Sequence, residues 1–144
     1  MNYTIYNPDT GQIQSILMFN DPDTAELNLK DKVYLLGSFT SEQYYVENDQ
    51  ATAKPDYPGN EQKIYLFDYE TKSWILTVDR TETVAREQRD LLLSEIDRVN
   101  PVWYATLSTE QQTALIAYRQ ALLDVPQQTG FPATVTWPTK PTWL

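Results

Sequence analysis

Residues 118–138 read YRQALLDVPQQTGFPATVTWP, and they mark the point where a helical sequence gives way to an extended one. The helical spacing of apolar residues continues as far as Asp124 and stops before Pro126, because proline lacks the backbone N–H that a helix interior requires. Three more prolines follow before the chain ends. The stretch therefore predicts a helix that ends before Pro126 and an extended arm over residues 127–144.

Two helices are predicted before Pro126. Ser108, with Gln111 three residues later, forms the pattern of a capping box and predicts the start of the helix that ends before Pro126. The preceding helix is expected to begin with Thr81 as its N-cap and to end before Pro101, since the residue before proline disfavours the helical conformation. The predicted apolar face of the helix that ends before Pro101 consists of Val84, Leu91, Leu92, Ile96 and Val99. That of the helix that begins after Ser108 consists of Ala114, Leu115, Tyr118, Ala121 and Leu122.

In the first 80 residues, apolar side chains recur with a period of two, which is typical of strands joined by turns. Asp21 and Asp23, in the turn-like segment 20–23, are interpreted as turn residues because Asp bonds readily to nearby backbone. The predicted fold class is thus α+β, with a β-hairpin-rich module over residues 1–80 and a helical hairpin with an extended arm over residues 81–144. The expected strands cover residues 3–7, 12–19, 32–37, 44–46 and 51–54 and the hairpin of residues 63–79.

Charge is distributed unevenly along the chain. Acidic residues outnumber basic ones by 20 to 11, and residues 1–79 hold 13 acids and 5 lysines, which gives −8 of the total −9. This excess disfavours a nucleic-acid partner, because phosphate binding requires clustered Lys and Arg. Apolar runs such as residues 16–19 are far shorter than the ~20 residues of a membrane span. We expect a soluble intracellular protein without a membrane or nucleic-acid partner.

The residues for catalysis or metal binding are largely missing. The chain has no cysteine and no histidine, which excludes thiol and imidazole catalysis and zinc sites built from these ligands. Its four glycines are scattered, so they predict no phosphate-binding loop. Residues 20–23 lack the ligand spacing of a calcium-binding EF-hand loop. We therefore predict no catalytic, cofactor-binding or metal-binding residues, and a protein that is not an enzyme.

The candidates for partner binding lie near the end of the second helix and on the arm, and most of them are aromatic or apolar. Trp137 and Trp143 lie on the extended arm, where they either fold back onto the helices or contact a partner. Arg119 is interpreted either as a charge that complements the helix C-terminus or as a partner contact. Leu123 and Ile116 widen the apolar stripe of this helix beyond one packing face, either for the arm or for a docking partner. The candidate partner-binding residues are Tyr118, Arg119, Leu123, Phe131, Trp137 and Trp143.

Taken together, residues 80–141 resemble the C-terminal region of bacteriophage tail assembly chaperones, and the broader tail-fibre assembly proteins share part of the pattern. Where that family usually has Trp and Arg, this chain has Arg98 and Leu123. The matching elements are Arg89, Leu91-Leu92 and Asp97 in the first helix, Tyr118-Arg119-Gln120 and Leu122 in the second, and Asp124-Val125-Pro126, Phe131-Pro132, Trp137-Pro138 and Pro141 after it.

The resemblance implies a non-enzymatic chaperone that binds a phage tail-fibre or tail protein and assists its folding or assembly. It implies action in the host cytoplasm during phage assembly and requires no cofactor. An alternative is a structural component of the phage tail or baseplate that stays in the virion. The client and the oligomeric state are left open by the sequence.

Overall fold

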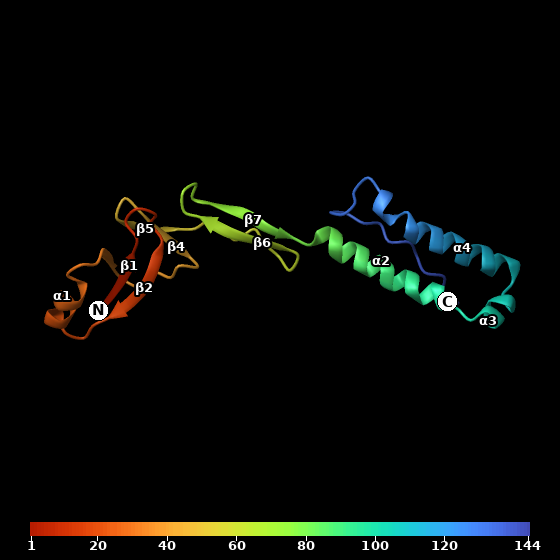
Figure 1. Ribbon diagram of the computed structural model, residues 1–144, viewed down its shortest axis with the longest axis horizontal. Coiled ribbons are helices and arrows are strands. Elements are labelled where there is room, and N and C mark those ends of the chain that lie inside the picture. Colours follow the sequence, from red (N-terminus) through yellow and green to blue (C-terminus); the bar gives the residue numbers. More distant parts are fainter. The chain divides into compact units, whose positions relative to one another are not determined.

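The computed structural model describes residues 1–144 and has antiparallel strands followed by helices, so the predicted α+β class is confirmed (Figure 1). The chain divides into two compact units, each with a hydrophobic core of its own. The first unit contains Met1–Gly59 and Ile64–Thr77. The second contains Asn60–Lys63 and Val78–Leu144.

A three-stranded sheet forms the beginning of the first unit. Strand β1 (Asn2–Tyr6) is central and pairs antiparallel with β2 (Ile13–Met18) and with β3 (Tyr34–Leu36). The turn between β1 and β2 includes Gly11, whose φ of +75° suits glycine and whose missing side chain lets the Val46 carbonyl approach closely. The predicted strands at residues 3–7 and 12–19 are therefore present, with the turn where Pro and Gly place it.

A short helix, α1 (Pro22–Leu29), corrects the interpretation of residues 20–23 as a turn. Asp21 accepts a hydrogen bond from the Thr24 backbone N–H at 2.8 Å, so this residue caps a helix. Hydrogen bonds from the Thr24 side chain and backbone also lower the pKa of Asp21. Ala25 and Leu29, one turn apart, pack against β1 in the first core. Only these two residues of α1 are buried, which is too few for a helical period to be recognised in the sequence.

A second hairpin joins β4 (Tyr44–Glu47) to β5 (Gln50–Ala53). Asn48 and Asp49 form its turn with φ values of 52° and 56°, the left-handed conformation that two-residue hairpin turns require. The Tyr6 hydroxyl donates a hydrogen bond of 2.6 Å to Asp49 Oδ1 and so joins this turn to β1. This hydrogen bond, together with burial of Tyr6 and the negative charge of Asp49, raises the pKa of Tyr6 to about 12.

The Tyr6–Asp49 contact predicts a loss of stability at high pH. The folded chain holds the phenol proton more tightly than the unfolded chain, whose Tyr6 has an ordinary pKa of 10.0. The stabilisation is therefore complete below pH 10 and is lost as the pH rises from about 10 to about 12. Urea unfolding at several pH values should show this decline, and Tyr6→Phe should reduce it. Tyr34→Phe, at a hydroxyl without a hydrogen bond, is the matched control; an equal reduction in both variants would contradict the prediction.

The predicted hairpin of residues 63–79 is confirmed as β6 (Lys63–Asp68) and β7 (Ser73–Asp79). Asp68 accepts hydrogen bonds from the backbone N–H groups of Glu70 and Thr71, which closes the turn. Phe67 packs its ring 5.2 Å from that of Trp74 and 5.4 Å from that of Tyr45, measured between centroids. Aromatic packing thus attaches this hairpin to the rest of the first unit.

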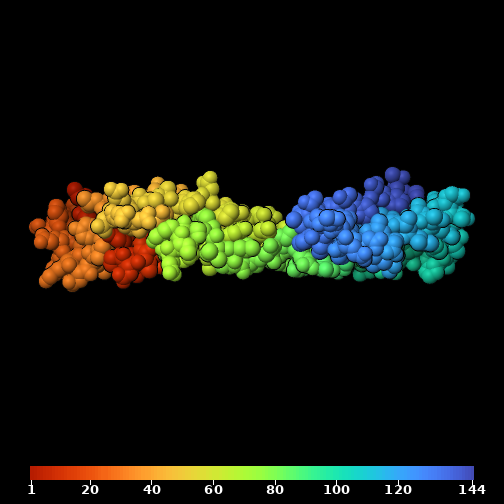
Figure 2. All heavy atoms as spheres, turned by 90° about the horizontal axis from the view of Figure 1, so that it is seen from above, coloured from red at the N-terminus to blue at the C-terminus, as the bar shows by residue number.

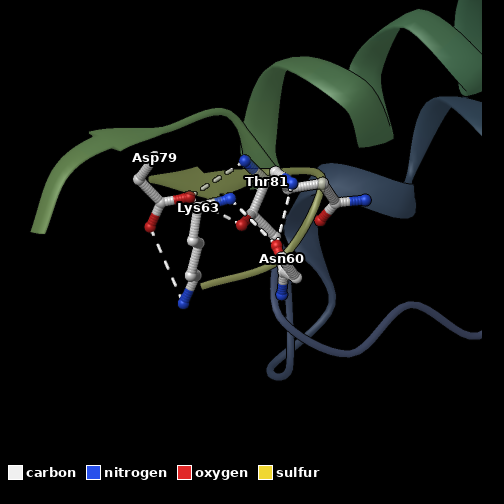
Figure 3. A network of polar contacts seen from close by, with 5 residues as sticks. Asn60, Lys63, Asp79 and Thr81 are labelled. Carbon is white, nitrogen blue, oxygen red and sulfur yellow. Dashed lines mark hydrogen bonds and ion pairs between the residues drawn. The ribbon is translucent and has the colours of Figure 1, made fainter. Parts of the chain in front are cut away.

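Helix α2 (Thr81–Asp97) begins differently from the prediction. Thr81 is the first helical residue and not the N-cap, because its backbone N–H and hydroxyl both donate to Asp79, at 2.9 and 2.6 Å (Figure 3). Lys63 Nζ lies 3.8 Å from the same carboxylate, and Asn60 Oδ1 accepts a hydrogen bond from the backbone N–H of Lys63. The hydrogen bonds from Thr81, followed by the charge of Lys63, lower the pKa of Asp79. The carboxylate therefore stabilises the start of the helix from outside it.

The remaining helices follow the local signals of the sequence. Asn100 caps the five-residue α3 (Pro101–Ala105), and Ser108 and Gln111 form the predicted capping box of α4 (Thr109–Leu123). Helix α4 ends before Pro126 as expected, and the 3-10 helix η1 (Val125–Gln127) follows it. One prediction for α2 was wrong: Leu91 is 69% exposed, since a step of about 100° per residue turns it away from Leu92.

Candidate partner-binding surface

The second unit is built around the contact between α2 and α4. Ile96 of α2 and Leu115, Tyr118 and Leu122 of α4 are the buried residues of its core, and Leu122 is completely inaccessible. The i, i+3 and i+7 spacing of the three α4 residues places them on one face of the helix. The half-buried residues around them are Leu92, Leu93, Tyr104, Leu107, Trp137, Trp143 and Leu144.

The C-terminal arm packs against the helices of its own unit. Trp137 and Trp143 contact the core, and the Trp143 ring lies 6.5 Å from that of Trp103 on α3, measured between centroids. In Figure 1 the arm runs back from the end of α4 towards α3, and Figure 2 shows its last residues, in dark blue, against the atoms of the preceding helices. Of the two possibilities that the sequence left open for these tryptophans, the structure has the folded-back one.

Polar contacts hold the arm along its length. The Gln128 side chain donates to the Thr136 carbonyl at 2.8 Å and accepts from the Thr136 N–H at 2.9 Å, which closes a loop between them. Lys140 Nζ lies 2.9 Å from Glu95 Oε2 on α2. The Arg86 guanidinium lies 5.4 Å from the centre of the Phe131 ring. Each exposed contact is weak by itself, so the packing of the tryptophans contributes most to docking of the arm.

An apolar groove remains open beside the core. It has a volume of about 320 Å³ and lies where the end of α2, the start of α3 and the middle of α4 meet. Ile116 is 61% exposed at its wall, although it is a large aliphatic side chain on a helix. The groove is lined by Ile96, Val99, Pro101, Tyr104, Leu115 and Ile116, with Asp97 and Arg119 as its charged residues.

The charged residues of the groove form an ion pair across the two helices. Arg119 Nε donates to Asp97 Oδ1 at 2.9 Å, and both side chains are about half exposed. An exposed pair of this kind contributes only about 0–1 kcal/mol to stability. The pair gives Arg119 a partner on α2, in addition to its place near the C-terminal end of α4. Its polar atoms lie beside an apolar hollow, an arrangement typical of binding sites that combine apolar burial with a few polar contacts.

The structure places the six predicted partner-binding residues in different surroundings. Arg119 alone lies at the groove. Tyr118 is 6% exposed within the core, while Trp137 and Trp143 are half-buried against it. Leu123 and Phe131 are half-buried elsewhere. The other groove residues were not predicted as a site, because they come from three helices and only Ile116 carried a signal, as an apolar residue in excess of one packing face.

Residues 82–142 match the sequence pattern of the family described as phage tail assembly chaperone protein. Residues 82–142 therefore belong to this family. The suspected membership is confirmed for this segment, which begins in α2 and contains α4, nearly all of the arm and the complete groove. No match was found among curated proteins or solved structures.

Membership supports a role of this phage tail assembly chaperone domain in tail assembly, with phage tail proteins as its interaction partners. It also favours a role other than catalysis. No group of three or more His, Cys, Asp or Glu side chains is placed to hold a metal ion. None of the helices has the length and apolar character needed to cross a membrane.

Proposed function

We propose that the protein is a non-enzymatic chaperone that binds a phage tail-fibre protein in the host cytoplasm and assists its folding or assembly. The observation that supports this proposal is the exposed apolar groove within the tail assembly chaperone domain. Exposed apolar side chains are costly in water unless a partner covers them. A groove with Ile116 at its wall can bury one or two apolar side chains of a client.

The chemistry of a fibre protein fits such a groove. Fibre proteins are rich in β structure, and their strand edges and apolar patches invite misassociation before the fold is closed. In this proposal the groove covers one of these patches, and Arg119 and Asp97 bind polar groups at its margin. Tyr118, Trp137 and Trp143 support the groove from the core, while Leu123 and Phe131 add their exposed parts to the contact. The net charge of −8 in residues 1–79 keeps the complex soluble.

Co-expression with a tail-fibre protein of the same phage, as the candidate client, tests the groove. We expect Ile116→Asp to lower the recovery of soluble client and its pull-down about tenfold, because a carboxylate is poorly tolerated in an apolar contact. Leu91→Asp is the matched control, since Leu91 is also exposed on a helix of this domain but lies outside the groove. Both variants should keep the wild-type melting temperature. Equal loss of client with both variants, or with neither, would argue against the groove.

Mass spectrometry of purified phage particles tests the chaperone role. A chaperone leaves its client before the particle is complete, so the protein should be absent from particles whose tail fibres are present. Its presence at the copy number of a tail component would instead identify it as a structural component of the tail or baseplate.

A further inference from the structure

An aromatic cleft in the first unit forms a second candidate site, which is separate from the groove in the tail assembly chaperone domain. It has a volume of about 540 Å³ and is bordered by the β4–β5 hairpin, by residues 55–57 and by Trp74 of β7. Its lining residues include the aromatic Tyr57 and Trp74 and the acidic Glu42 and Asp56. We propose that this cleft binds an arginine side chain on a basic segment of a protein partner.

The aromatic walls are held in place before any partner arrives. The Trp74 indole N–H donates to the Pro55 carbonyl at 2.8 Å, and the Tyr57 hydroxyl accepts from the Tyr65 backbone N–H at 3.1 Å. The rings of Tyr57 and Trp74 meet edge to face, with 5.0 Å between centroids. Tyr57 nevertheless remains 50% exposed. A rigid and exposed aromatic surface loses little conformational entropy on binding, which favours its use as a contact.

This aromatic cluster already stabilises one cation. Lys54 Nζ lies 4.4 Å from the centre of the Phe67 ring, 4.9 Å from that of Tyr69 and 5.6 Å from that of Trp74, all within the range of cation–π attraction. It also donates hydrogen bonds to the Ser41 carbonyl and the Tyr69 hydroxyl. These contacts keep the ammonium group nearest to Phe67. Trp74 is the ring that Lys54 engages least.

The charges at the cleft favour a second cation over an anion. Glu42 and Asp56 are exposed, and their carboxylates form no hydrogen bond or ion pair within the chain, so both are available to a partner. Their two negative charges outweigh the one positive charge of Lys54 at the cleft. Residues 1–79 as a whole carry a net charge of −8, which attracts basic partners. Arginine suits the cleft better than lysine because its planar guanidinium is weakly hydrated and stacks on aromatic rings.

A titration of the full chain with short peptides tests the proposal without any client protein. The probe is a hexapeptide of alternating glycine and arginine, and its control carries neutral citrulline in place of each arginine. We expect the arginine peptide to shift the nuclear magnetic resonance signal of the Trp74 indole N–H, assigned through its loss in Trp74→Phe. The shift should decrease with added salt. An equal shift with the citrulline peptide, or no shift with either peptide, would overturn the proposal.

Charge variants separate the cleft from general attraction to an acidic protein. The double variant Glu42→Gln, Asp56→Asn should bind the arginine peptide with roughly fivefold lower affinity, as expected when two contacts with a cation are lost. Glu26→Gln with Asp31→Asn removes the same charge from exposed positions of this unit outside the cleft and should change affinity less than about twofold. Equal weakening by both pairs would reduce the proposal to nonspecific attraction.

Lys54 provides a test with the opposite sign. Lys54→Met keeps most of the side-chain packing and removes a like charge, so the arginine peptide should bind more tightly to this variant. If a glutamate peptide binds the wild type instead and Lys54→Met abolishes that binding, the cleft takes an anion and the proposal is wrong. Because no tail protein enters these titrations, their outcome is independent of the proposed chaperone function.

Discussion

Deletion of residues 131–144 is expected to lower the melting temperature of the second unit by more than about 10 °C. The deletion removes Trp137, Trp143 and Leu144 from the core and exposes the apolar side chains beneath them, including Leu115 and Leu122. Losing a well-packed tryptophan costs about 3 kcal/mol or more, and a change of 1 kcal/mol shifts a unit of this size by roughly 4–8 °C. Thermal unfolding followed by far-ultraviolet circular dichroism measures the shift, because most helix lies in this unit.

Single substitutions show whether the tryptophans cause the effect of the deletion. Trp137→Ala should reproduce a large part of the decrease, whereas Thr139→Ala, at an exposed position of the same arm, should change the melting temperature little. One outcome would give the arm a role in binding in place of a role in folding. If the shortened chain melts at the wild-type temperature but no longer retains the client, the arm is a docking segment and not part of the fold.

Leu122→Ala is expected to destabilise the second unit by about 2–5 kcal/mol. Leu122 has no accessible surface and packs with Ile96, Leu115 and Tyr118, so its loss leaves a cavity between α2 and α4. Ile116→Ala lies on the same helix at a 61% exposed position, and we expect its effect to stay within about 0.5 kcal/mol. The free energy of unfolding in urea, measured for both variants, gives the comparison.

Client binding by these two variants separates fold from function. Below the melting transition of Leu122→Ala, its groove residues are unchanged, so it should still bind the client. Ile116→Ala keeps the fold and removes part of the wall of the groove, and it should bind more weakly. If Leu122→Ala were as stable as the wild type, the α2–α4 contact would not be the core of this unit.

Local chemistry made the helical part of the fold predictable from the sequence. The capping box at Ser108 and Gln111 and the break before Pro126 involve neighbouring residues, so their signals do not depend on the rest of the fold. The hairpins were predictable for the same reason, since turn residues at Asn48–Asp49 and at residues 8–11 lie between short apolar runs. These features require no knowledge of distant contacts.

Features that depend on distant or weak contacts were not predicted. Helix α1 buries only Ala25 and Leu29, and its N-cap, Asp21, has the composition of a turn. Asp79 accepts the hydrogen bonds of the first turn of α2 from the preceding strand, a contact that the local pattern does not reveal, so the sequence alone predicts Thr81 as the cap. The groove combines residues from three helices, and the cleft combines residues that lie more than thirty positions apart. Neither hollow corresponds to a continuous sequence pattern.

The placement of the four tryptophans gives the protein an optical reporter of its own. Trp74 is the only tryptophan of the first unit, while Trp103, Trp137 and Trp143 all lie in the second. In Trp74→Phe, fluorescence excited at the tryptophan band comes from α3 and the arm alone. Because the Trp103 and Trp143 rings are 6.5 Å apart, their near-ultraviolet circular dichroism should include a coupled signal that disappears when the arm leaves the helices. Docking of the arm can thus be followed in solution without an attached dye.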